Sequence, residues 1–182
     1  MSYPPVIVQV LLLLVVIPAA LFDYRQRRVP NWITFSGVAI AIGLNFFLYE
    51  TPGLFMSLKG LGLALLIYFP LFAIRGMGAG DVKLMGAIGA AVGWQNWLGV
   101  LVLTSAFGGV AAIIIVASRG RLRRTFQNIW LIVLSLLHRQ APYELNPQLD
   151  VKSTEGVRLP HAVAIAFGTI GFLIAATIWA PR

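Results

Sequence analysis

Long apolar segments alternate with short polar ones along the whole chain. One apolar stretch, residues 84–117, is too long for a single membrane span and short for two. Because Trp94-Gln-Asn-Trp97 lies inside it, and tryptophan favours the headgroup region, we predict a tight interfacial turn there. The pattern then predicts about six transmembrane helices, with a short fourth one, at residues 6–22, 32–49, 54–74, 83–93, 97–117 and 159–180.

A weaker apolar segment follows the fifth predicted span. Its uninterrupted apolar core, residues 129–137, is too short to cross a bilayer, and arginines crowd its start. We therefore predict a basic amphipathic helix at about residues 121–138, lying in the cytoplasmic interface, and a polar cytoplasmic loop at 139–158. The apolar face of this helix comprises Leu122, Phe126, Ile129, Val133, Leu136 and Leu137.

Composition fixes the class of protein. The chain is 59% hydrophobic and 11% charged, with a mean hydropathy of +0.85, whereas a soluble domain carries roughly 25% charged residues. We therefore expect an all-α polytopic membrane protein with a single domain, residues 1–182. The absence of cysteine excludes a disulfide framework, a cysteine-based zinc site and a cysteine nucleophile.

The net charge of +8 is explained by membrane topology. The positive-inside rule places the N-terminus outside, and of the 14 basic residues only Lys59 and Arg182 then fall on the outer side. A single span over residues 84–117 would move the arginines at 119–124 outside, so the charges favour six spans. We expect anionic lipid headgroups as partners of these arginines, and no nucleic acid.

Two aspartates carry the candidate chemistry. Asp23 and Asp81 each lie at the predicted cytoplasmic end of an apolar helix, where an ionisable residue suggests a function. Two carboxyls on one face suit acid–base hydrolysis of a peptide bond. The plainer alternative, which spacing leaves open, is that Asp23 pairs with Arg27 and Asp81 with Lys83. The other carboxylates lie in turns or the polar loop and are expected to be solvated: Glu50, Glu144, Asp150 and Glu155.

Glycines precede the second aspartate. Gly76, Gly78 and Gly80 permit a positive φ or the close approach of another backbone, such as an extended peptide beside Asp81. The later glycines are expected to pack helices against one another: Gly86, Gly89 and Gly93.

Both aspartate motifs resemble those of the type IV prepilin peptidases, polytopic aspartic endopeptidases of the G-x-G-D class. The first motif is Asp23-Tyr-Arg-Gln-Arg-Arg-Val-Pro30-Asn31, and the second is Gly78-Ala-Gly80-Asp81-Val-Lys83-Leu84, before a short Gly-rich helix. The opening of the last span, Arg158-Leu-Pro-His161, is similar to the start of the family's final helix. The resemblance extends from Val6 to Gly168.

The resemblance implies that Asp23 and Asp81 are the catalytic pair, sharing one proton. The ionised carboxylate would accept a proton from water and the protonated one would donate to the scissile carbonyl oxygen. No metal and no cofactor are implied. The substrate would be a prepilin or pseudopilin, cleaved at the cytoplasmic face of the bacterial inner membrane. Residues implied to bind substrate or shape the site are Pro30, Asn31, Gly78, Gly80, Lys83 and His161.

The chain departs from the family pattern in two places. Many members carry a cysteine-containing cytoplasmic domain linked to N-methylation, and this cysteine-free chain is similar to the short peptidases that serve Tad/Flp-type pili. We therefore expect no N-methyltransferase activity. His161 stands where an aromatic residue is common, either as an interfacial polar residue or as a group that tunes the aspartates.

Two other classes of membrane protein would show different sequence features. A small transporter or proton carrier would place its carboxylates nearer the midplane, commonly in a repeated architecture. A protease of the presenilin or signal-peptide-peptidase type would carry Tyr-Asp, where this chain has Asp23-Tyr24.

Overall fold

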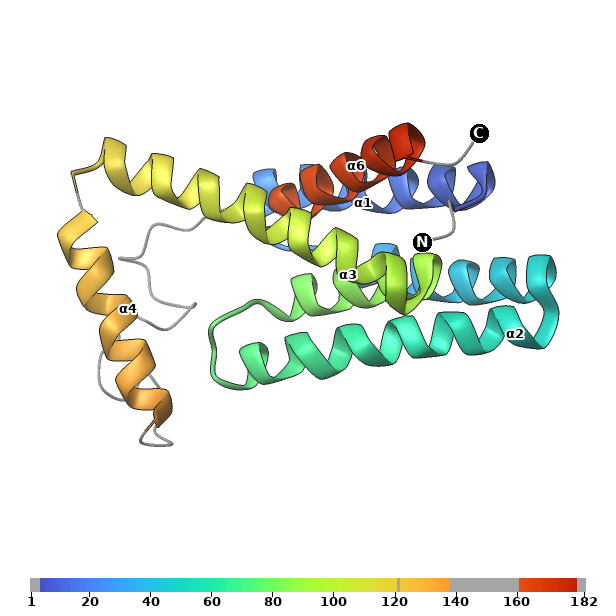
Figure 1. Ribbon diagram of the computed structural model, residues 1–182, viewed down its shortest axis with the longest axis horizontal. Coiled ribbons are helices and arrows are strands. Elements are labelled where there is room, and N and C mark those ends of the chain that lie inside the picture. The colour runs from blue at the N-terminus through green and yellow to red at the C-terminus, as the bar shows by residue number, and fades with distance from the viewer. Residues whose placement is uncertain (1–3, 121, 138–160, 180–182) are drawn as a thin grey trace.

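The computed structural model describes residues 4–120, 122–137 and 161–179, and every regular element in these ranges is an α-helix (Figure 1). The helices are α1 (Val6–Gln26), α2 (Asn31–Ala73), α3 (Ala79–Ser118), α4 (Leu122–Leu137) and α6 (His161–Trp179). Four of them, α1, α2, α3 and α6, are long and apolar enough to cross a membrane. The predicted class, an all-α membrane protein, is confirmed.

Helices α2 and α3 each fold back on themselves at one non-helical residue. In α2 this residue is Glu50, with φ 55° and ψ −140°. In α3 it is Gly93, with φ 75° and ψ 168°, a conformation that costs glycine little. Figure 1 shows the two halves of each helix running in opposite directions.

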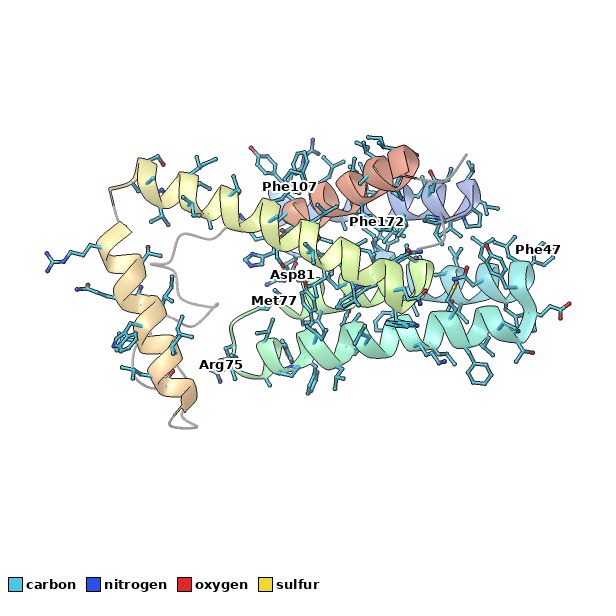
Figure 2. All side chains as sticks on the ribbon, viewed as in Figure 1. Phe47, Arg75, Met77, Asp81, Phe107 and Phe172 are labelled. Atoms are coloured by element: carbon cyan, nitrogen blue, oxygen red, sulfur yellow. The ribbon has the colours of Figure 1, made fainter. Side chains whose placement is uncertain are left out.

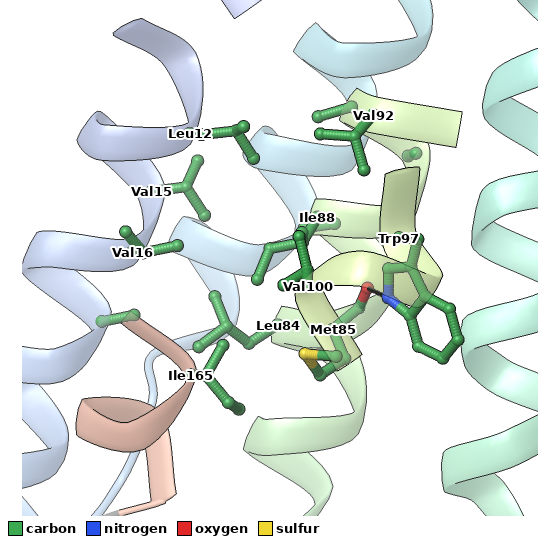
Figure 3. Close-up of a cluster of buried hydrophobic side chains, with 14 of the residues drawn as sticks. Leu12, Val15, Val16, Leu84, Met85, Ile88, Val92, Trp97, Val100 and Ile165 are labelled. Carbon is green, nitrogen blue, oxygen red and sulfur yellow. Dashed lines mark hydrogen bonds between the residues drawn. The ribbon is translucent and has the colours of Figure 1, made fainter. Parts of the chain in front are cut away.

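The position of the turn in α3 corrects the prediction. We expected the turn at Trp94–Trp97, with tryptophan at the membrane surface, but these residues are helical and the break lies at Gly93. Trp97 is fully buried, and its Nε1 donates a hydrogen bond to the Met85 carbonyl at 3.0 Å (Figure 3). The N–H of an indole can find a hydrogen-bond acceptor inside a bundle as well as at a membrane interface, so the presence of tryptophan did not by itself locate the turn.

Asn45 compensates for the break at Gly93. A helix end leaves its last carbonyls without intrahelical partners, and in a membrane neighbouring side chains must satisfy them. The Asn45 side chain is buried, and its Nδ2 donates to the carbonyls of Ala90 and Ala91 at 3.0 and 3.1 Å. The same nitrogen donates to Ser57 Oγ at 2.8 Å, which ties together the two halves of α2.

Glycine pairs allow the closest helix contacts. A Cβ added to Gly60 of α2 would lie 2.7 Å from the Gly89 carbonyl carbon of α3 and would clash with the carbonyl oxygen. Gly89 therefore packs helices as expected. The adjoining core includes Leu12 and Val16 from α1, Leu84 and Ile88 from α3, and Ile165 from α6 (Figure 3), and α2 adds further buried residues.

One end of the bundle gathers several helix ends that are distant in sequence. The end of α1, both ends of α2, and the starts of α3 and α6 lie there, and α4 lies beyond them (Figure 1). Helix α4 matches the predicted amphipathic helix in extent, and Ile129, Trp130 and Val133 are exposed along it. Its location in a membrane interface stays a prediction. The predicted polar loop, residues 139–158, lies outside the described residues.

Candidate active site

Asp23 occupies the last turn of α1, which continues to Gln26, beyond the predicted end of the span. The helix stops at Arg27, which adopts a left-handed conformation and donates its N–H to the Asp23 carbonyl at 2.9 Å. The Asp23 side chain is only 9% exposed. Its Oδ2 accepts a hydrogen bond from the backbone N–H of Ala162 in α6 at 3.1 Å. The carboxyl group is thereby fixed between the first and last helices.

Asp81 lies in the first turn of α3, which begins directly after Gly78. Its backbone N–H donates to the Gly78 carbonyl at 3.2 Å. Asp23 and His161 are both close enough to interact electrostatically with Asp81. Asp81 and Met77 lie toward one end of the bundle, whereas Phe47 lies at the opposite end (Figure 2). The fold thus brings the two predicted aspartates together from separate helices.

A cavity of about 560 Å³ opens beside the two aspartates. The connection between α1 and α2 forms one wall and the start of α3 forms the other. Its lining residues are Asp23, Gln26, Arg27, Arg28, Val29, Pro30, Asn31, Gly78, Ala79, Gly80, Asp81 and Lys83. Every predicted site residue except His161 therefore lines this cavity, and His161 begins the helix that binds Asp23.

Lys83 links the two motifs. Its Nζ donates to Asn31 Oδ1 at 2.9 Å and lies 5.1 Å from the centre of the Phe35 ring. The alternative in which Lys83 serves as the ion-pair partner of Asp81 is therefore not the arrangement observed. The contact instead joins the first turn of α3 to the first turn of α2, and so fixes the mouth of the cavity.

Of the two reasons expected for the glycines before Asp81, a positive φ and a close approach, the structure supports the second. Neither Gly78, with φ −76°, nor Gly80 has a positive φ. Instead, a Cβ on Gly80 would lie 3.1 Å from Val29 Cβ, and one on Gly78 would lie 3.3 Å from Asp81 Oδ2. Close approach is the reason for both: Gly80 lets α3 approach the α1–α2 connection, and Gly78 leaves space beside the carboxyl group.

Sequence reasoning missed Tyr68. This residue of α2 is 4% exposed, packs edge-on against Trp97 with ring centres 6.0 Å apart, and interacts electrostatically with Asp81. The available signal was a phenol inside the long apolar run at residues 54–74, since a buried tyrosine hydroxyl usually requires a polar partner.

The described part of the chain contains no group of three or more histidine and carboxylate side chains that could hold a metal ion. The cavity is lined by the carboxyl groups of both Asp23 and Asp81. The buried phenol of Tyr68 interacts electrostatically with Asp81.

Comparison with known proteins decides the family. The family model described as "Type IV leader peptidase family" matches residues 10–113, which is more than half of the chain and includes both aspartates. The chain belongs to the type IV leader peptidase family. The resemblance carried by the two aspartate motifs is therefore confirmed.

One curated relative is similar over much of the chain. The prepilin leader peptidase/N-methyltransferase of Escherichia coli strain K12 is 26% identical over 133 residues, which cover 68% of this chain. The aligned part is 58% of the relative, so this chain spans little more than half of that protein's length. No solved structure was found to match the chain.

Proposed function

We propose that this chain is a membrane aspartic endopeptidase that removes the basic leader from type IV prepilins or pseudopilins. One observation carries the proposal. Asp23 and Asp81, contributed by separate helices, line one cavity in a protein of the type IV leader peptidase family. The curated relative from Escherichia coli is named a prepilin leader peptidase/N-methyltransferase, and its peptidase activity is of the same kind.

The proposed chemistry follows from the proximity of the two carboxyl groups. Two neighbouring carboxyls do not easily ionise together, so the pair holds one proton between them. The ionised carboxylate takes a proton from a water molecule as the water oxygen attacks the scissile carbonyl carbon. The protonated carboxyl donates to the carbonyl oxygen and gives a tetrahedral diol. Collapse of the diol breaks the C–N bond, and the leaving amine takes up a proton.

We also propose an orientation in the bacterial inner membrane. Each of the six helical segments, with α2 and α3 counted as two each, would cross the bilayer, and the N-terminus would be outside. Basic residues gather at the end that carries the aspartates, which favours a cytoplasmic location for the cavity. This end carries Arg25, Arg27, Arg28, Arg75 and Lys83. Helix α4 would lie in the cytoplasmic interface, with its arginines on anionic headgroups.

Co-expression with candidate pilins, followed by mass measurement of the pilin N-terminus, tests the proposed activity. We expect a pilin shortened by its leader when the protein is present, and the full-length prepilin when it is absent. The same mass shows whether the new N-terminus carries a methyl group, which we expect it to lack. Full-length prepilin in both cases, across every encoded pilin, would remove the proposed function.

A further inference from the structure

The amino end of α6 contacts Asp23 directly. The N–H of Ala162, the second residue of α6, donates to Asp23 Oδ2 at 3.1 Å. Ala162 is completely buried, so water does not compete for this contact. The preceding residue, His161, lies close enough to Asp81 to interact with it electrostatically. Helix α6 thus reaches both aspartates with two consecutive residues, although it lies outside the part of the chain that matches the family.

The packing of α6 against α3 fixes the position of the Ala162 amide relative to Asp23. A Cβ added to Gly168 would lie 2.5 Å from the Thr104 backbone N and Cα of α3, so the two helices touch where glycine allows it. Ile165 and Phe172 are buried on either side of this contact. Since these contacts hold α6 against α3, they also hold the Ala162 N–H at Asp23.

We propose that the amino end of α6 is a positioning element of the active site, in which the Ala162 amide orients the Asp23 carboxylate toward Asp81. The inference rests on the proposed function. The first four N–H groups of a helix have no intrahelical acceptor, and a carboxylate satisfies such a donor with a charge-assisted hydrogen bond. Anchoring Oδ2 stops the carboxylate from rotating and leaves Oδ1 for water.

A pair of proline substitutions tests this role. Proline is tolerated in the first turn of a helix and lacks the N–H, so Ala162→Pro deletes the donor while α6 is retained. Val163→Pro is the matched control, since it deletes the next N–H, which is not the donor to Asp23. We expect Ala162→Pro to lower kcat by roughly 10²-fold relative to Val163→Pro, with KM unchanged, as for a misplaced catalytic group. Equal kcat in two variants that melt at the same temperature would overturn the proposal.

Hydrogen exchange tests the contact without relying on the proline variant or on cleavage. In the full-length wild-type protein, we expect the Ala162 amide to exchange slowly, and Asp23→Ala to remove this protection. Asp81→Ala, which leaves the acceptor in place, should keep it. Equal exchange at Ala162 in the wild type and in Asp23→Ala would show that the amide does not hold Asp23. If the wild type cleaves no pilin, the proposed function fails, whereas the exchange result still reports on the contact.

Discussion

The carboxyl groups of Asp23 and Asp81 are held in different ways. Asp23 lies in the last turn of α1 and is anchored by an amide from α6, whereas Asp81 lies in the first turn of α3, beside the space left by Gly78. Each therefore depends on a different set of helix contacts. Single substitutions around the pair should separate these contributions.

Tyr68→Phe tests the buried phenol that interacts electrostatically with Asp81. The substitution keeps the ring that packs on Trp97 and removes only the hydroxyl group. We expect the protein to fold normally and its turnover of prepilin to fall about tenfold, which corresponds to ~1.4 kcal/mol. Tyr49→Phe, at a partly exposed residue that lines a separate cavity, is the control and should be unaffected. Equal turnover in both variants would show that the Tyr68 hydroxyl has no role in the reaction.

Gly80→Val tests the close approach of α3 to the α1–α2 connection. A Cβ added at this position would lie 3.1 Å from Val29 Cβ, so the larger valine side chain should displace the start of α3 together with Asp81. We expect cleavage to fall by at least tenfold, measured as the rate of leader removal. Gly62→Val is the proper control, since a Cβ there meets nothing within 4 Å. Wild-type cleavage by Gly80→Val would mean that the glycine is dispensable.

The sequence indicated some site residues and not others for physical reasons. Asp23 and Asp81 were foreseeable because carboxylates are costly at a membrane edge, and the charge pattern placed both at one end. The role of Gly80 was not foreseeable, because it depends on a contact with Val29, which is distant in sequence. Likewise, a Cβ added to Gly53 would lie 2.7 Å from the Asn45 carbonyl carbon, a contact that the local sequence does not reveal.

At the scale of the helices, Asn45 is the residue that makes the break in α3 tolerable. Asn45→Leu would leave the Ala90 and Ala91 carbonyls without this donor inside the bundle. We expect the free energy of unfolding to fall by about 1–3 kcal/mol, measured by unfolding in detergent micelles. Thr177→Val is a suitable control, because Thr177 is exposed and its hydroxyl donates to the Ile174 carbonyl within α6. An Asn45→Leu protein as stable as the wild type would contradict this explanation.

Helix ends were harder to predict than helices. The apolar runs located α1, α2, α3 and α6, but within the long run of α3 the polar residues Gln95 and Asn96 follow the turn and are themselves helical. The tryptophans suggested a turn at Trp94–Trp97, and the structure places the break at Gly93, where a glycine takes the positive φ easily. The donor that satisfies the carbonyls before the turn comes from Asn45, which is distant in sequence, so local patterns do not reveal it.

For the whole molecule, the proposed orientation requires both aspartates to face the cytoplasm. The cysteine-free chain allows a direct measurement, with single cysteines and a membrane-impermeant thiol reagent applied to intact cells. Gln26→Cys and Met77→Cys, at the end that carries the site, should be shielded, and Thr51→Cys at the opposite end should react. Labelling of Gln26→Cys together with protection of Thr51→Cys would show that the bundle is inverted.

The central claim is that Asp23 and Asp81 act together in peptide hydrolysis, and single amide substitutions test it most directly. Asparagine keeps the shape of the side chain but cannot share the proton. In co-expression with a pilin that the wild type cleaves, Asp23→Asn and Asp81→Asn should each accumulate full-length prepilin while remaining folded in the membrane. Glu50→Gln, at the turn of α2, should process the pilin normally. Normal cleavage by either single aspartate variant would contradict the account.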